Sequence, residues 1–196
     1  MKPPGKQYEN ASSGAEATSG TLVARDGRTF HYRAIHPDDA PRLQNFHQRL
    51  SHRSLIFRFF GEMPELGSAL AERLSHVDYE DRMAIVATPG DDPDEPIIAV
   101  ARYERAEPWA AEFALAVEDR LQGQNIGPQL LLVLAHYARQ RGITELIANV
   151  MYDNDRMQAM LRHLPVPSVH HLLEGRVEVR LDISSLPAQR ETDLGR

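Results

Sequence analysis

The sequence contains no cysteine among its 196 residues. Disulfide bonds, thiolate nucleophiles and cysteine-based zinc sites are therefore excluded from its structure and chemistry. It also lacks an apolar run approaching the ~20 residues that a membrane-spanning helix needs. The longest such run, 130–135, would fill only a turn or two of a buried helix. Residues 1–20 contain no apolar segment of the kind found in secretory signals, so we expect a cytoplasmic protein that is not bound to membranes.

Basic residues are fewer than acidic ones, and the formal net charge is −6 at pH 7. This balance disfavours nucleic acid as the main ligand, because phosphate backbones are bound by a concentrated basic face. The one basic cluster, 47–58, contains Arg49, Arg53 and Arg58. It is either a solvated helix face or a contact for a cofactor phosphate or an acidic protein partner. The histidines show no H-x-x-x-H spacing, so we expect no metal site.

Two segments of low complexity flank a region in which strand and helix patterns alternate. Residues 1–20 are rich in Gly, Ser, Pro and Ala without a period and indicate a disordered tail. Residues 186–196 resemble a second, shorter tail. The part between them, 21–185, has the length of one domain with a full core.

The patterns of this central part predict six strands and five helices. The strands are expected at 28–35, 83–88, 96–105, 110–117, 145–151 and 177–183. The helices are expected at 38–50, 53–61, 64–76, 128–141 and 157–164. The last strand alternates apolar and charged residues, as a half-exposed antiparallel strand does. This order predicts a mixed sheet with helices on both faces and disfavours a doubly wound dinucleotide fold.

A turn rich in glycine and glutamine, QGQNIGP at 122–128, runs directly into the longest expected helix. Gly123 and Gly127 can adopt positive φ and let a ligand approach the backbone closely. Asn125 between them is the residue that best tolerates the left-handed region after glycine, and Pro128 suits the first turn of a helix. Successive backbone N–H groups here could bind an anion. The alternative is a turn that merely begins a buried helix.

Two familiar phosphate-binding motifs, G-x-x-x-x-G-K-[ST] and G-x-G-x-x-G, are absent from this turn. The turn resembles instead the [QR]-x-x-G-x-[GA] motif of the GNAT family of acyl-CoA-dependent N-acyltransferases. The motif positions are occupied by Gln122, Gly123, Gln124, Asn125, Ile126 and Gly127. Five of the six fit, counting the free positions, and Asn125 replaces the first motif glycine.

The resemblance extends beyond the turn, and the order of elements matches that of the family over 22–184. FALAVEDRLQGQNIG at 113–127 resembles the family's strand-to-loop run. ANVMYDNDRMQAML at 148–161 resembles its next strand and helix, with Asn154 at the CoA-contacting asparagine. The segment 32–60 is most similar to bacterial protein-lysine acetyltransferases of the Pat type, which modify acetyl-CoA synthetase.

This resemblance implies an α/β (α+β) GNAT fold with a mixed, mostly antiparallel central sheet of about six to seven strands. It also implies a position for acetyl-CoA. The pyrophosphate would lie on the amides of 122–127, and the pantetheine arm would bind the backbone of Leu115 and Val117. The acyl carbonyl would lie near Val117, and Asn154 would contact the CoA from the opposite side.

Acyl transfer to an amine requires a base, because an unperturbed lysine has a pKa of about 10.4. Glu112 opens the strand beside the implied cofactor and is the candidate, since Pat-type enzymes have a glutamate in a similar AEFA context. It could instead be a surface strand residue. The tyrosine that many members carry seven residues after the asparagine is replaced by Leu161. The leaving thiolate can take its proton from water. HLPVPS at 163–168 replaces the family's usual Gly-Phe after this helix, and its Pro165 and Pro167 end the helix and reshape the acceptor side.

The sequence thus predicts an N-acetyltransferase in which an amine attacks acetyl-CoA directly, with a protein lysine as the preferred acceptor. A small-molecule amine is one alternative acceptor, and a non-catalytic acyl-CoA-binding regulatory module is the rival function. We expect a monomer or homodimer that binds neither metal nor nucleic acid. Because a chain of this length leaves no room for an attached regulatory domain, we also expect no cyclic-nucleotide control of its own.

Overall fold

The computed structural model describes residues 18–92 and 94–187. Most of the tails predicted at 1–20 and 186–196 lies outside the described residues. The described chain nevertheless extends past both predicted boundaries. Its first strand begins at Ser19, and Leu186 packs against the core.

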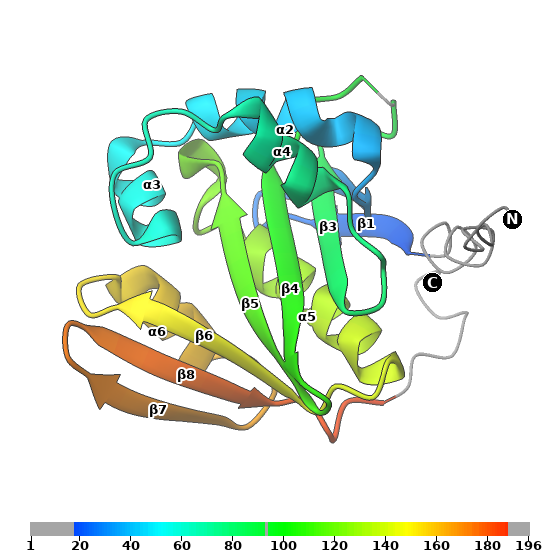
Figure 1. Ribbon diagram of the computed structural model, residues 1–196. Coiled ribbons are helices and arrows are strands. Elements are labelled where there is room, and N and C mark those ends of the chain that lie inside the picture. The colour runs from blue at the N-terminus through cyan, green and yellow to red at the C-terminus, as the bar shows by residue number, and fades with distance from the viewer. Residues whose placement is uncertain (1–17, 93, 188–196) are drawn as a thin grey trace, which may run out of the picture.

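One sheet of eight strands forms the centre of the molecule, in the order β1-β2-β3-β4-β5-β6-β8-β7 (Figure 1). The strands are β1 Ser19–Val23, β2 Thr29–Ala34, β3 Arg82–Thr88, β4 Ala99–Glu107, β5 Ala110–Val117, β6 Glu145–Met151, β7 Ser168–Leu173 and β8 Arg176–Asp182. Neighbouring strands are antiparallel except β5 and β6, which are parallel. The predicted mixed, mostly antiparallel sheet is therefore confirmed.

The predicted number of strands, six to seven, is too low, because the sheet has eight. All six strands expected from the sequence form, and the two that were missed are β1 and β7. Both lie at edges of the sheet. β1 has one buried residue, Leu22, and β7 has none. Such strands carry no alternation of apolar and polar residues from which they could be predicted.

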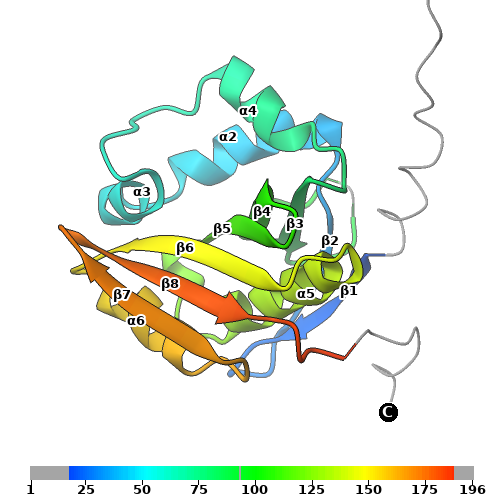
Figure 2. The same ribbon diagram turned by 60° about the horizontal axis from the view of Figure 1, so that its bottom comes forward.

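Helices cover both faces of the sheet, as Figures 1 and 2 show and as the sequence predicted. The helices α2 Ala40–Gln48, α3 His52–Phe59 and α4 Ser68–Ser75 lie on one face, and α5 Ile126–Gln140 and α6 Asp155–Arg162 on the other. Two short 3-10 turns, η1 Pro37–Asp39 and η2 Asp119–Leu121, lead into α2 and towards α5.

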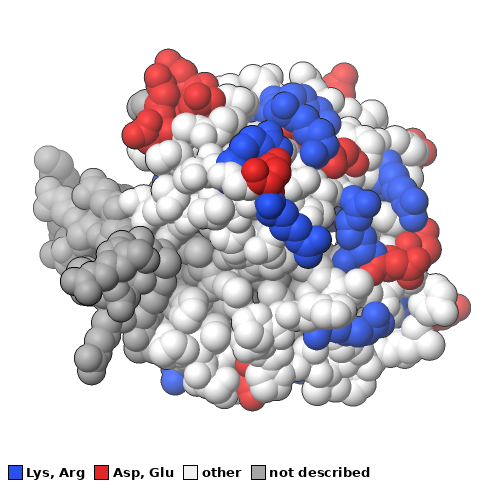
Figure 3. Space-filling model, turned by 180° about the vertical axis from the view of Figure 1, so that it is seen from behind, with Lys and Arg blue, Asp and Glu red and all other residues white. Residues whose placement is uncertain are grey.

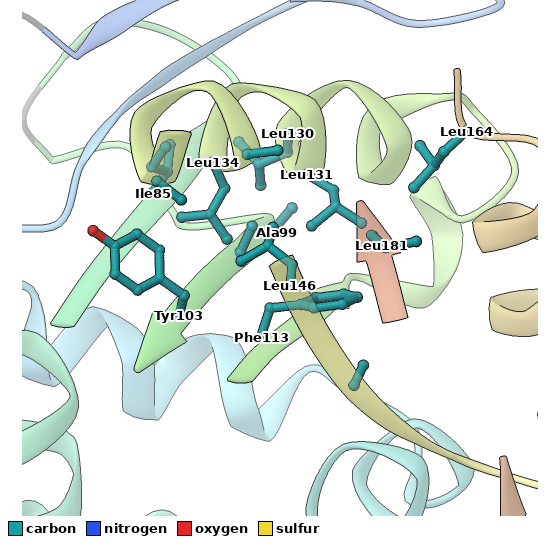
Figure 4. Packing of buried hydrophobic residues seen from close by; sticks show 14 of the residues in the cluster. Ile85, Ala99, Tyr103, Phe113, Leu130, Leu131, Leu134, Leu146, Leu164 and Leu181 are labelled. Carbon is teal, nitrogen blue, oxygen red and sulfur yellow. The ribbon is translucent and has the colours of Figure 1, made fainter. Parts of the chain in front are cut away.

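The core has two parts, one on each face of the sheet. Figure 4 shows the larger part, in which Leu130, Leu131 and Leu134 of α5 pack onto Ile85 and Phe113 of the sheet. The smaller part joins the apolar residues of α2 and α4 to the opposite face of β3 and β4. In β8 the buried positions alternate as the sequence predicted. Burial of both faces fixes the register of the central strands, because a slip of one residue would expose their apolar side chains.

Asp39 lies at the junction of β2 and α2, where its side chain is almost fully buried at 2% exposure. Arg33 donates two hydrogen bonds to it, of 2.7 and 2.8 Å, and Arg42 donates one of 2.7 Å. The backbone N–H of His36 donates another. Burial alone would raise the pKa of Asp39, but these hydrogen bonds outweigh burial and hold the pKa below its usual range. The ionised carboxylate therefore stabilises the fold.

Asp39→Asn is expected to lower the free energy of unfolding by about 3 kcal/mol near neutral pH, because it leaves two arginines without their shared partner. Because folding lowers the pKa of Asp39, its carboxylate stabilises the fold at pH values above its unfolded pKa of about 3.9. This contribution is lost as the pH falls through the folded pKa. The deficit of the variant should therefore shrink below pH ~4. Urea unfolding across this pH range measures it. Asp26→Asn, at an exposed ion pair with Arg28, is the control and should leave the unfolding midpoint unchanged. Equal deficits at all pH values would contradict this account.

Candidate active site

The strands β5 and β6 pair over only three residues, from Ala110 opposite Glu145 to Glu112 opposite Ile147. Beyond Glu112, β5 continues to pair with β4 alone, and β6 leans away together with β8 and β7 (Figure 1). A cavity of about 890 Å³ occupies the opening. It is lined by both strands, by α3, by the loop that precedes α5 and by the first turns of α6. Its volume is within the range of small-molecule sites.

The free edge of β5 presents backbone groups to this cavity. The N–H of Glu118 donates to Ile98 on the β4 side, over 2.9 Å. Because successive residues of a strand point their N–H groups to opposite sides, those of Leu115 and Val117 point into the opening. The carbonyl of Val117 lies on the same side, where it accepts a hydrogen bond from the side chain of Gln122. An extended ligand that carries amide groups could pair with this edge.

The loop before α5 adopts the left-handed conformation at two of the three predicted positions. Gly123 has φ 80° and Asn125 has φ 66°. Gly127 does not, and the prediction of a positive φ there was wrong because this residue belongs to the first turn of α5. A Cβ at Gly127 would lie 3.2 Å from Leu115 Cδ2 and 3.4 Å from Val117 Cγ2. The glycine therefore lets the helix approach β5 closely.

Several backbone donors of this loop lack acceptors. The N–H groups of Gly123 and Asn125 donate to no acceptor among the described residues. Ile126 and Gly127 are the first residues of α5, where N–H groups have no intrahelical partner, and Pro128 has no N–H at all. Converging N–H groups at the positive end of a helix form an anion site that needs no basic side chain.

The loop is fixed to the end of α2 and the start of α3 by two carboxylates. Asp119 accepts hydrogen bonds from Ser51 N–H, Ser51 Oγ and Ser54 Oγ. Burial would raise the pKa of Asp119, but the bonds from Ser51 and Ser54 outweigh it and keep the pKa below its usual range. Glu118 is buried and accepts from Arg49 over 3.2 Å. These contacts hold α3 over the cavity mouth.

Gln122 connects the loop to three other elements around the cavity. Its amide nitrogen donates to Ser54 Oγ of α3, over 3.2 Å, and to the Val117 carbonyl of β5, over 3.1 Å. Its amide oxygen accepts from Arg156 of α6. The first residue of the predicted motif therefore fixes the geometry of the loop through its side chain.

Eight of the ten residues predicted for the site line the cavity. These are Glu112, Leu115, Val117, Gln122, Gly123, Asn125, Gly127 and Asn154. Gln124 and Ile126 do not line it. The side chain of Ile126 is 1% exposed and belongs to the core. The carbonyl of Gln124 accepts from the N–H of Arg25, and its own N–H donates to Leu121. The backbone N–H of Gln124 is therefore not free to bind a ligand.

Asn154 caps the N-terminus of α6, since its Oδ1 accepts a 3.2 Å hydrogen bond from the N–H of Met157. Its Nδ2 donates to no described residue and remains available to a ligand in the cavity. Met157 and Met160 of the same helix line the wall beside it. The asparagine therefore has a structural role that does not exclude ligand binding.

Glu112 lies at the narrow end of the opening, in the last residue pair before β5 and β6 diverge. On its other side it faces Glu104 of β4. The side chain is exposed and makes no hydrogen bond or ion pair with any residue that the structure describes. A free carboxylate at this place can accept a proton from an amine that enters the cavity, directly or through one water.

No tyrosine among residues 18–92 and 94–187 lines the cavity. Leu161, at the position where a tyrosine was considered, is fully buried in the core. Tyr152, near it in sequence, is 63% exposed and lies outside the cavity.

Sequence reasoning missed several polar residues of the cavity wall, among them Arg25, Asn149 and Arg156. They come from three separate segments that only the fold brings together. Asn149 Oδ1 is buried without a hydrogen-bond partner among the described residues. Seen from behind in Figure 3, basic residues gather on the half of the molecule away from the termini, the half that contains α3 and α6.

Within the described ranges, no group of three or more His, Asp or Glu side chains is arranged to hold a metal ion. No helix in that part of the chain is long and apolar enough to cross a membrane.

Comparison with known proteins agrees with this geometry. The Acetyltransferase (GNAT) family matches residues 44–164. A Pseudomonas aeruginosa acetyltransferase is 32% identical over 122 residues, covering 62% of this chain and 66% of that protein. The acetyltransferase Pat of Mycolicibacterium smegmatis is 34% identical over 145 residues, covering 73% of this chain and 43% of that protein.

Among solved structures, the GNAT domain of S. lividans PAT has a TM-score of 0.77 at 31% identity, covering 84% of this chain and 97% of that domain. The chain thus spans 66% and 43% of the length of the two full-length relatives. The predicted fold and the resemblance to Pat-type proteins are both confirmed. The chain belongs to the GNAT family of acetyltransferases.

Proposed function

We propose that this chain transfers an acetyl group from acetyl-CoA to an amine, and that a protein lysine is the acceptor. The observation that carries the proposal is the position of Glu112, whose free carboxylate lies where β5 and β6 diverge, at one end of a cavity bordered by unpaired backbone donors. Membership of the GNAT family supports the reaction type.

The residues of the cavity fit an acyl-CoA. The N–H groups of Gly123, Asn125, Ile126 and Gly127 would hold the pyrophosphate, since those in the loop and first helical turn lack acceptors. The edge of β5 at Leu115 and Val117 would hold the amides of the pantetheine arm. The unpartnered oxygen of Asn149 on β6 could accept from a ligand N–H, and Asn154 could donate to one.

Bound acetyl-CoA supplies a thioester carbonyl, which an uncharged amine attacks directly so that a C–N bond forms and the C–S bond breaks. Glu112 would receive the proton that the amine loses, directly or through a water. Because no tyrosine of the described residues lines the cavity, the thiolate would take its proton from solvent. No covalent intermediate with the protein is needed.

The lysine acceptor rests on the similarity of residues 32–60 to Pat-type enzymes, and the proposed setting is the cytoplasm. A small-molecule amine is the alternative acceptor. A module that binds acyl-CoA without turnover is the rival function, supported by the missing tyrosine and by Asn125 at a glycine position.

Glu112→Gln should lower kcat by about 100-fold or more, the usual contribution of general base catalysis, and leave the Kd for acetyl-CoA within about twofold. CoA release with lysine peptides and small amines measures the first quantity, and calorimetry the second. Glu104→Gln is the matched control, because Glu104 pairs with Glu112 on the neighbouring strand β4 but does not line the cavity. If both variants lose the same activity, or neither does, Glu112 is not the base. A wild-type protein that binds acetyl-CoA and turns over no amine would support the rival.

Asn125→Val should weaken acetyl-CoA binding about tenfold, because a β-branched residue disfavours the left-handed conformation by roughly 1–2 kcal/mol. Asn125→Gly preserves this conformation and the N–H, so its affinity should equal or exceed that of the wild type. Titration calorimetry of both variants measures the difference. Equal affinities of Asn125→Val and wild type would show that the loop conformation does not hold the cofactor.

A further inference from the structure

A second, smaller cavity adjoins the first beneath α3. We call it the side cavity. The two share five lining residues, which are Leu50, Arg58, Phe59, Ala114 and Ala116. Ala114 and Ala116 belong to β5, where they alternate with Leu115 and Val117, the two residues whose backbone N–H groups point into the opening. The volume of the side cavity is about 40 Å³. Since a water occupies roughly 10–15 Å³ on this measure, the space suits a few waters or one small planar group.

Most of the wall of the side cavity is apolar, but three of its residues carry nitrogen donors: His47, Arg58 and Arg102. His47 is 2% exposed, and neither ring nitrogen makes a hydrogen bond within the described residues. Burial lowers its pKa, and the nearby Met63 carbonyl opposes this only in part. A buried polar ring without partners costs stability unless another group satisfies it.

Neither arginine forms a hydrogen bond or an ion pair with a carboxylate of the described residues. Arg58 makes no hydrogen bond or ion pair with any described residue and lies against the ring of Phe59, 4.9 Å from its centre. Arg102 makes one hydrogen bond, of 3.3 Å, to the carbonyl of Leu74 at the end of α4. Burial lowers the pKa of Arg102 to about 10, together with repulsion from Arg58 and Arg82 that attraction to Glu104 opposes only in part. Two neighbouring guanidinium groups in apolar surroundings attract an anion strongly.

We propose that the side cavity binds the carboxylate of a substrate through Arg58, Arg102 and His47. The proposal rests on the proposed acyl transfer, because the cavity adjoins the one in which that reaction would occur. A planar carboxylate matches the fork of a guanidinium and accepts several hydrogen bonds. The group would be carried on a short chain that passes the small side chains of Ala114 and Ala116.

Two substrates could bring this carboxylate. One is an acyl-CoA whose acyl chain ends in an acid, such as succinyl-CoA, and the other is a small amine that carries an acid. The first source would make the chain an acyltransferase for dicarboxylic acyl groups. The second would favour a carboxylated amine over a protein lysine as acceptor.

Calorimetry with succinyl-CoA and acetyl-CoA tests the first source. If the donor brings the carboxylate, wild-type protein should bind succinyl-CoA about tenfold or more tightly than acetyl-CoA. Arg58→Met and Arg102→Met should each remove that preference. Arg102→Met should also leave acetyl-CoA affinity unchanged, because Arg102 lines the side cavity and not the larger one. Arg176→Met is the control, because Arg176 is an exposed cation of β8 outside both cavities. It should keep the preference.

Thermal melting with β-alanine and ethylamine, in the presence of CoA, tests the second source. If the acceptor brings the carboxylate, β-alanine should raise the melting temperature and ethylamine should not. Both arginine variants should abolish the rise. The proposal is overturned if wild-type protein binds succinyl-CoA no more tightly than acetyl-CoA and its melting temperature responds equally to β-alanine and ethylamine. A loss of stability in Arg102→Met without a change in either preference would also overturn it, because Arg102 would then only cap α4. Failure to bind any CoA compound would contradict the proposed function and this inference with it.

Discussion

The end of pairing between β5 and β6 after Glu112 is the constraint on which the rest of the site depends. Backbone N–H and C=O groups that are not paired within a sheet need other hydrogen-bond partners. A ligand with amide groups can supply these partners along the free edge of β5. The opening is kept from closing by helices on both faces of the sheet. Below it, Met157 and Met160 of α6 line the wall, and above it α3 is tied to the loop through Asp119.

The loop before α5 shows which property of its motif is physically required. A left-handed backbone is needed at residue 125, and asparagine can adopt it, so the replacement of a glycine there keeps both the conformation and the N–H group. Gly127 has a different requirement, because the space for its Cβ is occupied by Leu115 and Val117. One glycine position thus tolerates substitution, and the other is constrained by packing.

Local patterns in the sequence predicted most of the fold and the loop, because alternation, helix periodicity and turn residues act over a few neighbouring positions. The edge strands β1 and β7 could not be predicted in this way, since they bury almost no side chains. The side cavity was also beyond sequence reasoning. Arg58 was visible as part of a basic cluster, but its proximity to Arg102 and to the unpartnered ring of His47 arises only when α2 and α3 pack on β4.

Amide hydrogen exchange of the wild-type protein with and without acetyl-CoA tests the central claim most directly, because it locates the ligand as well as detecting it. The account predicts slower exchange at Leu115, Val117, Gly123 and residues 125–127 with acetyl-CoA and with CoA, and no change with ATP. Protection confined to another surface, or no protection at saturating acetyl-CoA, would contradict the claim that the opening between β5 and β6 receives the cofactor.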